Sequence, residues 1–196
     1  SKGLQAMSNI PDFLSTVLFI NVLFTKGFRW GILGREMPNR RRSASVGLML
    51  FIPKEKAAHE KRVATTPETV KKLIALGCRV SVETSAGIGS SYTDDSYKAA
   101  GAEIAGSAAE GFKAADVVLA VQAPSDLKVM KKGALLIAML APFSNKDIVK
   151  NSAAAGITAF AMELVPRISR AQNLDVLSSQ SNLAGYKAVL DAADHY

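Results

Sequence analysis

The sequence contains few residues of the two types that most often bind transition metals or form disulfides. Cys78 is its single cysteine, and His59 and His195 are its two histidines. A lone cysteine excludes a disulfide within the chain and fits a reducing compartment. The cysteine and histidines do not have metal-ligand spacing, and no serine can be matched with a histidine for nucleophilic catalysis. We therefore predict no metal site and no catalytic acid or base.

A long hydrophobic run is also missing. The apolar stretch Phe13–Phe24 spans about twelve residues, whereas a membrane-spanning helix needs ~20. Residues 1–45 are otherwise rich in arginine and poor in acids, with a basic cluster at Arg40–Arg42. We predict that residues 1–45 are a poorly ordered leader or extension. They are either an organelle targeting segment or an extended start upstream of Met37.

Acidic residues are scarce only near the N-terminus. Residues 1–50 hold seven of the 24 Lys and Arg residues and two of the 17 acidic ones, so this segment carries +5 of the net charge of +7. Residues 51–196 carry the remaining +2 and are nearly neutral. This charge balance gives no basic surface for nucleic acid, and we predict no nucleic-acid partner.

Short apolar runs alternate with helical patterns from residue 46 to the end of the chain. Strands are predicted at residues 46–52, 79–83, 116–121, 134–139 and 157–162. Helices are predicted at residues 66–77, 95–100, 108–114, 126–132 and 145–154. Continuous apolar strands separated by helices are typical of a parallel sheet covered on both faces. Residues 46–196 are therefore predicted to form an α/β lobe with a three-layer, mostly parallel, doubly wound sheet of flavodoxin-like type.

A glycine-containing stretch, Gly87–Tyr92, follows one predicted strand but does not complete a dinucleotide fingerprint. Tyr92 stands where the third glycine belongs, and no helix begins directly after it. We interpret the stretch as a turn.

Polar residues are concentrated in the connection Pro166–Asp175, before a helix predicted to begin near Ser178 and to run to the chain end. Small residues on this helix predict tight packing against another element, and Ser178 or Ser179 is a candidate cap for its first turn. The connection has two interpretations. Arg167 pairs with Asp175 in a structural role near the positive end of the helix, or the connection is a binding loop on a rigid scaffold.

The stretch PRISRAQNLDVLSSQSNLAGYKAV, residues 166–189, closely resembles the NAD(H)-binding component, domain I, of the proton-translocating nicotinamide nucleotide transhydrogenase. The resemblance extends from about Val46 to Tyr196, within the alanine dehydrogenase/transhydrogenase N-terminal domain family. In that family an Arg…Gln…Asp loop lies over the nicotinamide of NAD(H). The cofactor-binding residues implied by the resemblance are Arg167, Ile168, Ser169, Gln172, Asn173, Leu174, Asp175 and Ser178.

The resemblance also implies an activity and partners. Domain I passes a hydride from NADH to NADP⁺ held on a separate domain or subunit, while a membrane domain couples the transfer to proton movement. A homodimer is expected, located in the cytoplasm at the inner membrane or on the mitochondrial matrix side. The family's second, Rossmann-type lobe is absent from this chain. We therefore expect the chain alone to be a truncated fragment that binds NAD(H) weakly and catalyses nothing.

Two alternatives remain. In the related alanine dehydrogenases an arginine at the place of Arg62, after the first strand, holds the substrate carboxylate. That family also needs a lysine near Gln122 and a histidine near Ala141, and their absence here disfavours an amino-acid dehydrogenase. The other alternative is a non-enzymatic α/β module that acts by association through an exposed face of the last helix.

Overall fold

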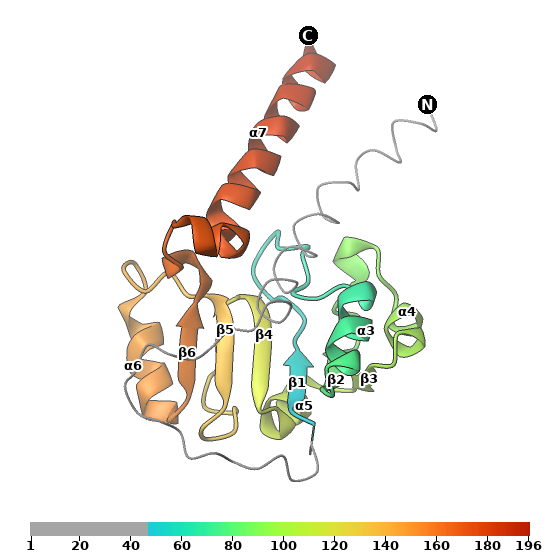
Figure 1. The fold of residues 1–196 in the computed structure, drawn as a ribbon, viewed down its shortest axis with the longest axis vertical. Helices are drawn as coiled ribbons and strands as arrows, with labels where there is room; N and C mark the ends of the chain where they lie inside the picture. Colours follow the sequence, from blue (N-terminus) through green and yellow to red (C-terminus); the bar gives the residue numbers. More distant parts are fainter. Residues whose placement is uncertain (1–46) are drawn as a thin grey trace.

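The computed structural model describes residues 47–196, in which strands and helices alternate along the chain (Figure 1). The predicted leader and Val46 lie outside these residues.

A single sheet of six parallel strands forms the centre of the lobe. The strands are β1 (Met49–Ile52), β2 (Arg79–Glu83), β3 (Glu103–Ala105), β4 (Val117–Gln122), β5 (Leu135–Met139) and β6 (Thr158–Ala161). Their spatial order is β3-β2-β1-β4-β5-β6, and every neighbouring pair is parallel. The five predicted strands take the flavodoxin-type order, and the unpredicted strand β3 extends one edge. The predicted doubly wound α/β fold is confirmed.

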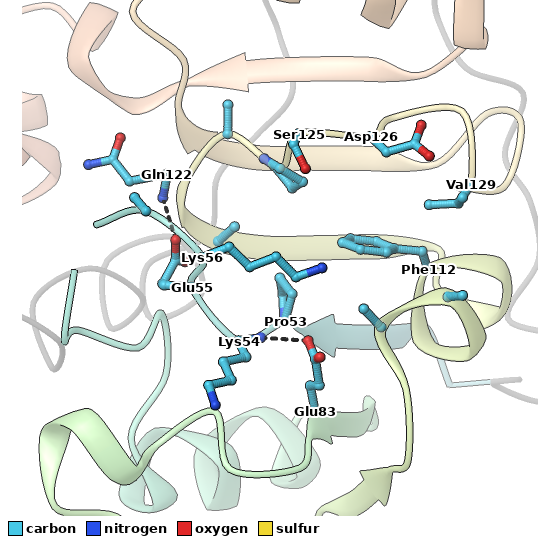
Figure 2. A pocket seen from close by; sticks show the side chains of 16 residues that line it. Pro53, Lys54, Glu55, Lys56, Glu83, Phe112, Gln122, Ser125, Asp126 and Val129 are labelled. Atoms are coloured by element: carbon cyan, nitrogen blue, oxygen red, sulfur yellow. Dashed lines mark hydrogen bonds between the residues drawn. The ribbon is translucent and has the colours of Figure 1, made fainter. Parts of the chain in front are cut away.

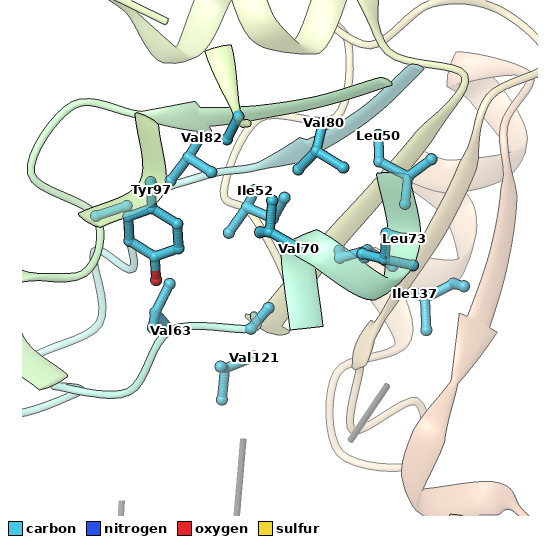
Figure 3. Close-up of a cluster of buried hydrophobic side chains, with 14 of the residues drawn as sticks. Leu50, Ile52, Val63, Val70, Leu73, Val80, Val82, Tyr97, Val121 and Ile137 are labelled. Carbon is cyan, nitrogen blue, oxygen red and sulfur yellow. The ribbon is translucent and has the colours of Figure 1, made fainter. Parts of the chain in front are cut away.

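Strand β1 shows how the sheet divides the core into two layers. Leu50 and Ile52 belong to one buried cluster, whereas Phe51 between them belongs to the other. Successive side chains of a strand point to opposite faces, so continuous apolar runs are required when both faces are covered. Figure 3 shows the first cluster, where Leu50 and Ile52 lie with Val70 and Tyr97 from the helices on that face.

Helices cover both faces. The first face carries α3 (Pro67–Ala75) and α4 (Asp94–Ala99), and the other carries α5 (Ala108–Ala114) and α6 (Lys146–Ala155). The side chains of Thr66, Thr93 and Ser107 cap α3, α4 and α5 by accepting a backbone N–H of the first turn. The turn predicted at Gly87–Tyr92 contains one short 3₁₀ helix, η1 (Ile88–Ser90).

The predicted helix at residues 126–132 is wrong. Asp126 Oδ1 accepts the backbone N–H of Lys128 at 3.0 Å, which closes a turn instead of a helical hydrogen bond. Leu127 and Met130 are buried in the second cluster. A spacing of three residues also occurs on one face of a helix, but these two side chains enter the core from an irregular connection.

The C-terminal part differs from the prediction at two points. After β6 come two 3₁₀ helices, η2 (Met162–Leu164) and η3 (Ser169–Leu174), and then α7 (Val176–His195). Asp175 is the N-cap of α7, so the helix begins two residues before Ser178, and the prediction of a Ser178 or Ser179 cap is wrong. Of its side chains only Val176 is buried, and Figure 1 shows α7 projecting from the sheet. The predicted tight packing of α7 is therefore not present in residues 47–196.

Candidate functional site

The carboxyl edge of the sheet is the place where a ligand of this fold is expected. The strand order reverses between β1 and β4, because the chain leaves β1 toward β2 and returns from β3 to β4. Ligands of open α/β sheets bind outside the carboxyl ends of the strands, at such a reversal. The connection that follows β1, residues 53–66, and the residues that follow β4 meet at this point.

Glu55 joins these two segments. Its Oε1 accepts the backbone N–H of Val121 at 2.6 Å, and its Oε2 accepts that of Gln122 at 3.2 Å. Burial raises the pKa of Glu55, and the two backbone hydrogen bonds oppose this rise. The N–H groups at the end of β4, which would suit an anionic ligand, are thus occupied by a carboxylate of the chain itself.

A cavity of 380 Å³ opens beside Glu55, on the face of the sheet covered by α5. Figure 2 shows the side chain of Lys56 reaching across it toward Phe112, with Asp126 and Val129 on the far wall. Lys54 lies on another wall, where its backbone N–H donates to Glu83 Oε2 at 2.8 Å. No local sequence pattern indicates this cavity, because α5 and the β4–β5 connection meet only in the folded lobe.

On the opposite side of the β1 connection, Arg62 contacts α7. Its Nε and Nη2 donate to the two carboxylate oxygens of Glu60 at 2.7 and 2.6 Å, and its Nη1 donates to Gln180 Oε1 at 2.9 Å. Burial alone raises the pKa of Glu60, but the hydrogen bonds and charge of Arg62 outweigh burial and lower it. Arg62 therefore links the connection after β1 to the second turn of α7. The sequence marked Arg62 as a candidate but contained no signal for its partner Gln180.

The predicted cofactor-binding residues lie on η3 and directly beside it, except Ser178, which lies in the first turn of α7. Arg167, Ile168, Ser169, Gln172 and Ser178 are exposed. Leu174 and Asp175 are half-buried, and the side chain of Asn173 lies outside the described part of the structure. The loop therefore presents most of its polar side chains to solvent while its C-terminal end is held against the lobe.

Asp175 is the centre of the polar contacts in this loop. Its Oδ1 accepts the backbone N–H of Ser178 at 3.0 Å, and its Oδ2 accepts the Ser178 hydroxyl at 2.6 Å. Arg167 Nε lies 3.8 Å from Asp175 Oδ2. The hydrogen bonds from Ser178, followed by the charge of Arg167, hold the pKa of Asp175 below its usual range. Gln172 joins this group through its backbone, where its carbonyl accepts the Asp175 N–H at 3.3 Å.

The chemistry that this loop can perform is recognition rather than proton transfer. Arg167 offers guanidinium donors, Gln172 offers an amide donor and acceptor, and Ser178 offers a hydroxyl. His59 and His195 are exposed and are not among the residues that contact Asp175. Across residues 47–196 there is no cluster of His, Cys, Asp and Glu that could hold a metal ion. Among the helices of the same residues, none is long and apolar enough to cross a membrane.

Together these features define a doubly wound α/β lobe with a polar, largely exposed loop at the carboxyl edge of its sheet. The family described as "Alanine dehydrogenase/PNT, N-terminal domain" matches residues 51–184. The chain belongs to this family, which confirms the resemblance noted in the sequence.

Named relatives come from both branches of the family. The first part of the NAD(P) transhydrogenase subunit alpha of Rhodospirillum rubrum is 50% identical over 153 residues, which cover 74% of this chain and 40% of that protein. The crystal structure of transhydrogenase from Sinorhizobium meliloti matches with a TM-score of 0.72 and 51% identity, covering 76% of this chain and 45% of that chain. An alanine dehydrogenase of Methanococcus maripaludis is 34% identical over 144 residues, which cover 72% of this chain and 38% of that protein. The chain thus spans about two fifths of the length of these curated relatives.

Proposed function

We propose that this chain is the N-terminal lobe of the NAD(H)-binding part of a proton-translocating transhydrogenase, which passes a hydride from NADH to NADP⁺. The observation that carries the proposal is the polar group of Asp175, Ser178 and Arg167 on a loop whose sequence matches the transhydrogenase pattern. The higher identity to the transhydrogenase subunit than to the alanine dehydrogenase supports the choice of branch.

The role proposed for the loop is to hold the nicotinamide end of NAD(H). Arg167 orders the loop through Asp175 and contacts the nicotinamide end, while Gln172, Asp175 and Ser178 bond its carboxamide or ribose. Ile168, Ser169 and Leu174 complete the surface around it. The hydride chemistry is supplied by the cofactor when it is bound, so the chain needs no acid or base of its own.

The residues fit the nicotinamide end of the cofactor better than its pyrophosphate. The exposed side chains of Arg167 and Gln172 can meet a carboxamide, whereas Glu55 already occupies the backbone N–H groups at the end of β4. The negative charge of Glu55 at that place would repel the phosphates. We propose that the pyrophosphate and adenosine are held by another part of the complete protein, and that this chain alone transfers no hydride.

The proposed partners follow from the same assignment. NADP(H) is held on a separate domain or subunit, and a membrane component couples the transfer to proton movement. The complete NAD(H)-binding component is proposed to form a homodimer at the cytoplasmic face of the inner membrane or on the mitochondrial matrix side.

Calorimetric titration with NADH tests the proposal. Saturable binding is expected for the unchanged chain, and Arg167→Ala is expected to weaken it by about tenfold, since a hydrogen bond from a charged group contributes about 1.5 kcal/mol or more. Arg79→Ala is the matched control, because Arg79 is also exposed but pairs with Glu103 at the other end of the sheet. Equal affinities of all three chains would contradict the proposal.

The alanine dehydrogenase alternative has less support in this structure. Gln122 and Ala141, where that branch needs a lysine and a histidine, bring an amide and a methyl group to the carboxyl edge. Neither group transfers protons at neutral pH.

The non-enzymatic alternative is favoured by one observation, the apolar side chains that α7 leaves exposed. They are Leu177, Tyr186, Val189 and Leu190. Light scattering of the purified chain with and without NADH separates this alternative from the proposed function. A stable dimer that is indifferent to NADH favours an association module.

A further inference from the structure

Glu163 connects the start of the nicotinamide-facing loop, residues 166–178, to the end of strand β5. It lies in η2, three residues before Pro166. Its Oε1 accepts the backbone N–H of Leu140 at 2.9 Å and also that of Ala141. One carboxylate oxygen therefore receives two successive backbone N–H groups at the point where β5 has ended.

The backbone that Glu163 holds is strained. Ala141 has a φ of 47°, in the left-handed region that a residue with a Cβ seldom adopts. Its carbonyl accepts the N–H of Ser144 at 3.1 Å and of Asn145 at 2.8 Å, in the turn that leads to α6. Such a conformation persists only where the surrounding contacts determine it, and the bond from Ala141 N–H to Glu163 is one of these contacts.

The second carboxylate oxygen of Glu163 lacks a hydrogen-bond donor among residues 47–196. Oε2 is buried and makes no hydrogen bond to any residue of the described part of the chain. A buried polar atom without a partner destabilises the fold, but an apolar residue in place of Glu163 would leave the N–H groups of Leu140 and Ala141 without this acceptor. The carboxylate therefore stabilises the connection between the end of β5 and η2.

We propose that Glu163 is a positioning residue that sets the direction of the nicotinamide-facing loop. The loop then has two anchors. Glu163 holds its start on β5, and Val176, which is buried in the first core cluster, holds its end beside Asp175. Arg167 and Gln172 lie between the anchors, so a shift of the first anchor redirects both side chains. This inference rests on the proposed function of the loop.

Three variants separate the position of the Glu163 carboxylate from its charge. Glu163→Gln keeps the length and one acceptor oxygen, whereas Glu163→Asp keeps the charge but withdraws it by one methylene, and Glu163→Ala removes both. Hydrogen–deuterium exchange of the amides from Ile168 to Asp175 is the readout. We expect exchange there to be about tenfold faster in the Asp and Ala variants and close to unchanged in the Gln variant. If the Ala variant does not fold, the comparison of the Asp and Gln variants still tests whether Glu163 positions the loop.

Glu83→Ala is the matched control, because Glu83 also receives a backbone N–H, from Lys54, at the carboxyl end of a strand. It is expected to change exchange near Lys54 and not in the loop. An unchanged loop in the Asp and Ala variants would overturn the inference, and so would faster exchange spread evenly over the whole sheet, which is the mark of a general loss of stability.

NADH titration of the same variants shows which proposal fails. About tenfold weaker binding by the Asp and Ala variants is expected, with little change for Gln. Normal binding by variants whose loop exchanges faster would overturn the positioning role and leave the proposed function intact. If the unchanged chain itself shows no binding, the proposed function is contradicted, and the exchange data still decide whether Glu163 orders the loop.

Discussion

Asp175 and Ser178 close the junction between η3 and α7. Both oxygens of Asp175 are engaged by Ser178, one by its backbone N–H at 3.0 Å and the other by its hydroxyl at 2.6 Å. The same carboxylate faces Arg167 across the loop. Asp175 therefore acts as a helix cap on one side and as an ordering group for the loop on the other. The structural and the ligand-binding interpretations of this residue do not exclude each other.

The cap predicts a pH dependence of the loop. Because hydrogen bonds from Ser178 lower the pKa of Asp175 in the folded chain, the folded state binds this proton less tightly than the unfolded state. The contribution of Asp175 to stability is complete above the ordinary aspartate pKa of about 3.9 and is lost as the pH falls through the lowered value. The chemical shift of the Ser178 amide, followed from about pH 6 downward, is expected to titrate with a midpoint below about 3.9.

Asp175→Asn is the control for this titration. Asparagine is a good helix cap, so the first turn of α7 should remain formed, while the shift of the Ser178 amide should no longer change with pH. A midpoint at or above the ordinary aspartate value in the unchanged chain would contradict the role assigned to Asp175.

The bond between Arg62 and Gln180 predicts an energetic coupling between residues that are 118 positions apart. Gln180→Ala is expected to lower the free energy of unfolding by about 0.5–1.5 kcal/mol, the usual net value of one hydrogen bond. In a double-mutant cycle with Arg62→Ala, the two effects should not be additive, because both substitutions remove the same contact. Urea unfolding of the four chains measures the coupling, and strict additivity would show that the bond contributes nothing.

Substitution by alanine is expected to change the stability of the lobe in opposite directions at two glycines. An added Cβ at Gly111 in α5 would overlap the ring of Phe51, whereas an added Cβ at Gly185 would meet no atom within 4 Å from residues 47–196 outside its own turn of α7. Gly111→Ala is expected to destabilise the lobe by about 1–3 kcal/mol through overpacking. Gly185→Ala is expected to be neutral or to stabilise by up to about 1 kcal/mol, because alanine is the better helix former.

Thermal unfolding of both glycine variants checks this pair. A Gly111→Ala variant as stable as the unchanged chain would mean that α5 does not approach the sheet as closely as the structure places it.

Periodicity predicted those parts of the fold whose local pattern and tertiary role agree. The apolar runs around Leu50 and Leu136 are buried on both faces of the sheet, and five of the six strands were recognised in this way. Strand β3 was missed because it has only three residues, begins with Glu103 and lies at the sheet edge. So short a segment pairs because β2 is already in place, which its own sequence does not show.

The parts of the candidate site that were not predicted are contacts between segments far apart in the sequence. The bonds of Glu55 to Val121 and Gln122 depend on the approach of β4 to β1. The same holds for the bond of Glu163 to Leu140. Resemblance to a family supplied the loop residues, whereas the anchors of that loop became visible only in the folded lobe.

The most direct test of the account divides the cofactor into its two halves. We would follow the backbone amides of the ¹⁵N-labelled chain by NMR during titration with reduced nicotinamide mononucleotide and, separately, with AMP. Saturable shifts between Arg167 and Ser178 are expected with the nicotinamide half and should be lost in Arg167→Ala. No shifts in that loop are expected with AMP. A loop that does not respond to the nicotinamide half at millimolar concentration, or responds equally to AMP, would contradict the assignment of residues 166–178 to the nicotinamide.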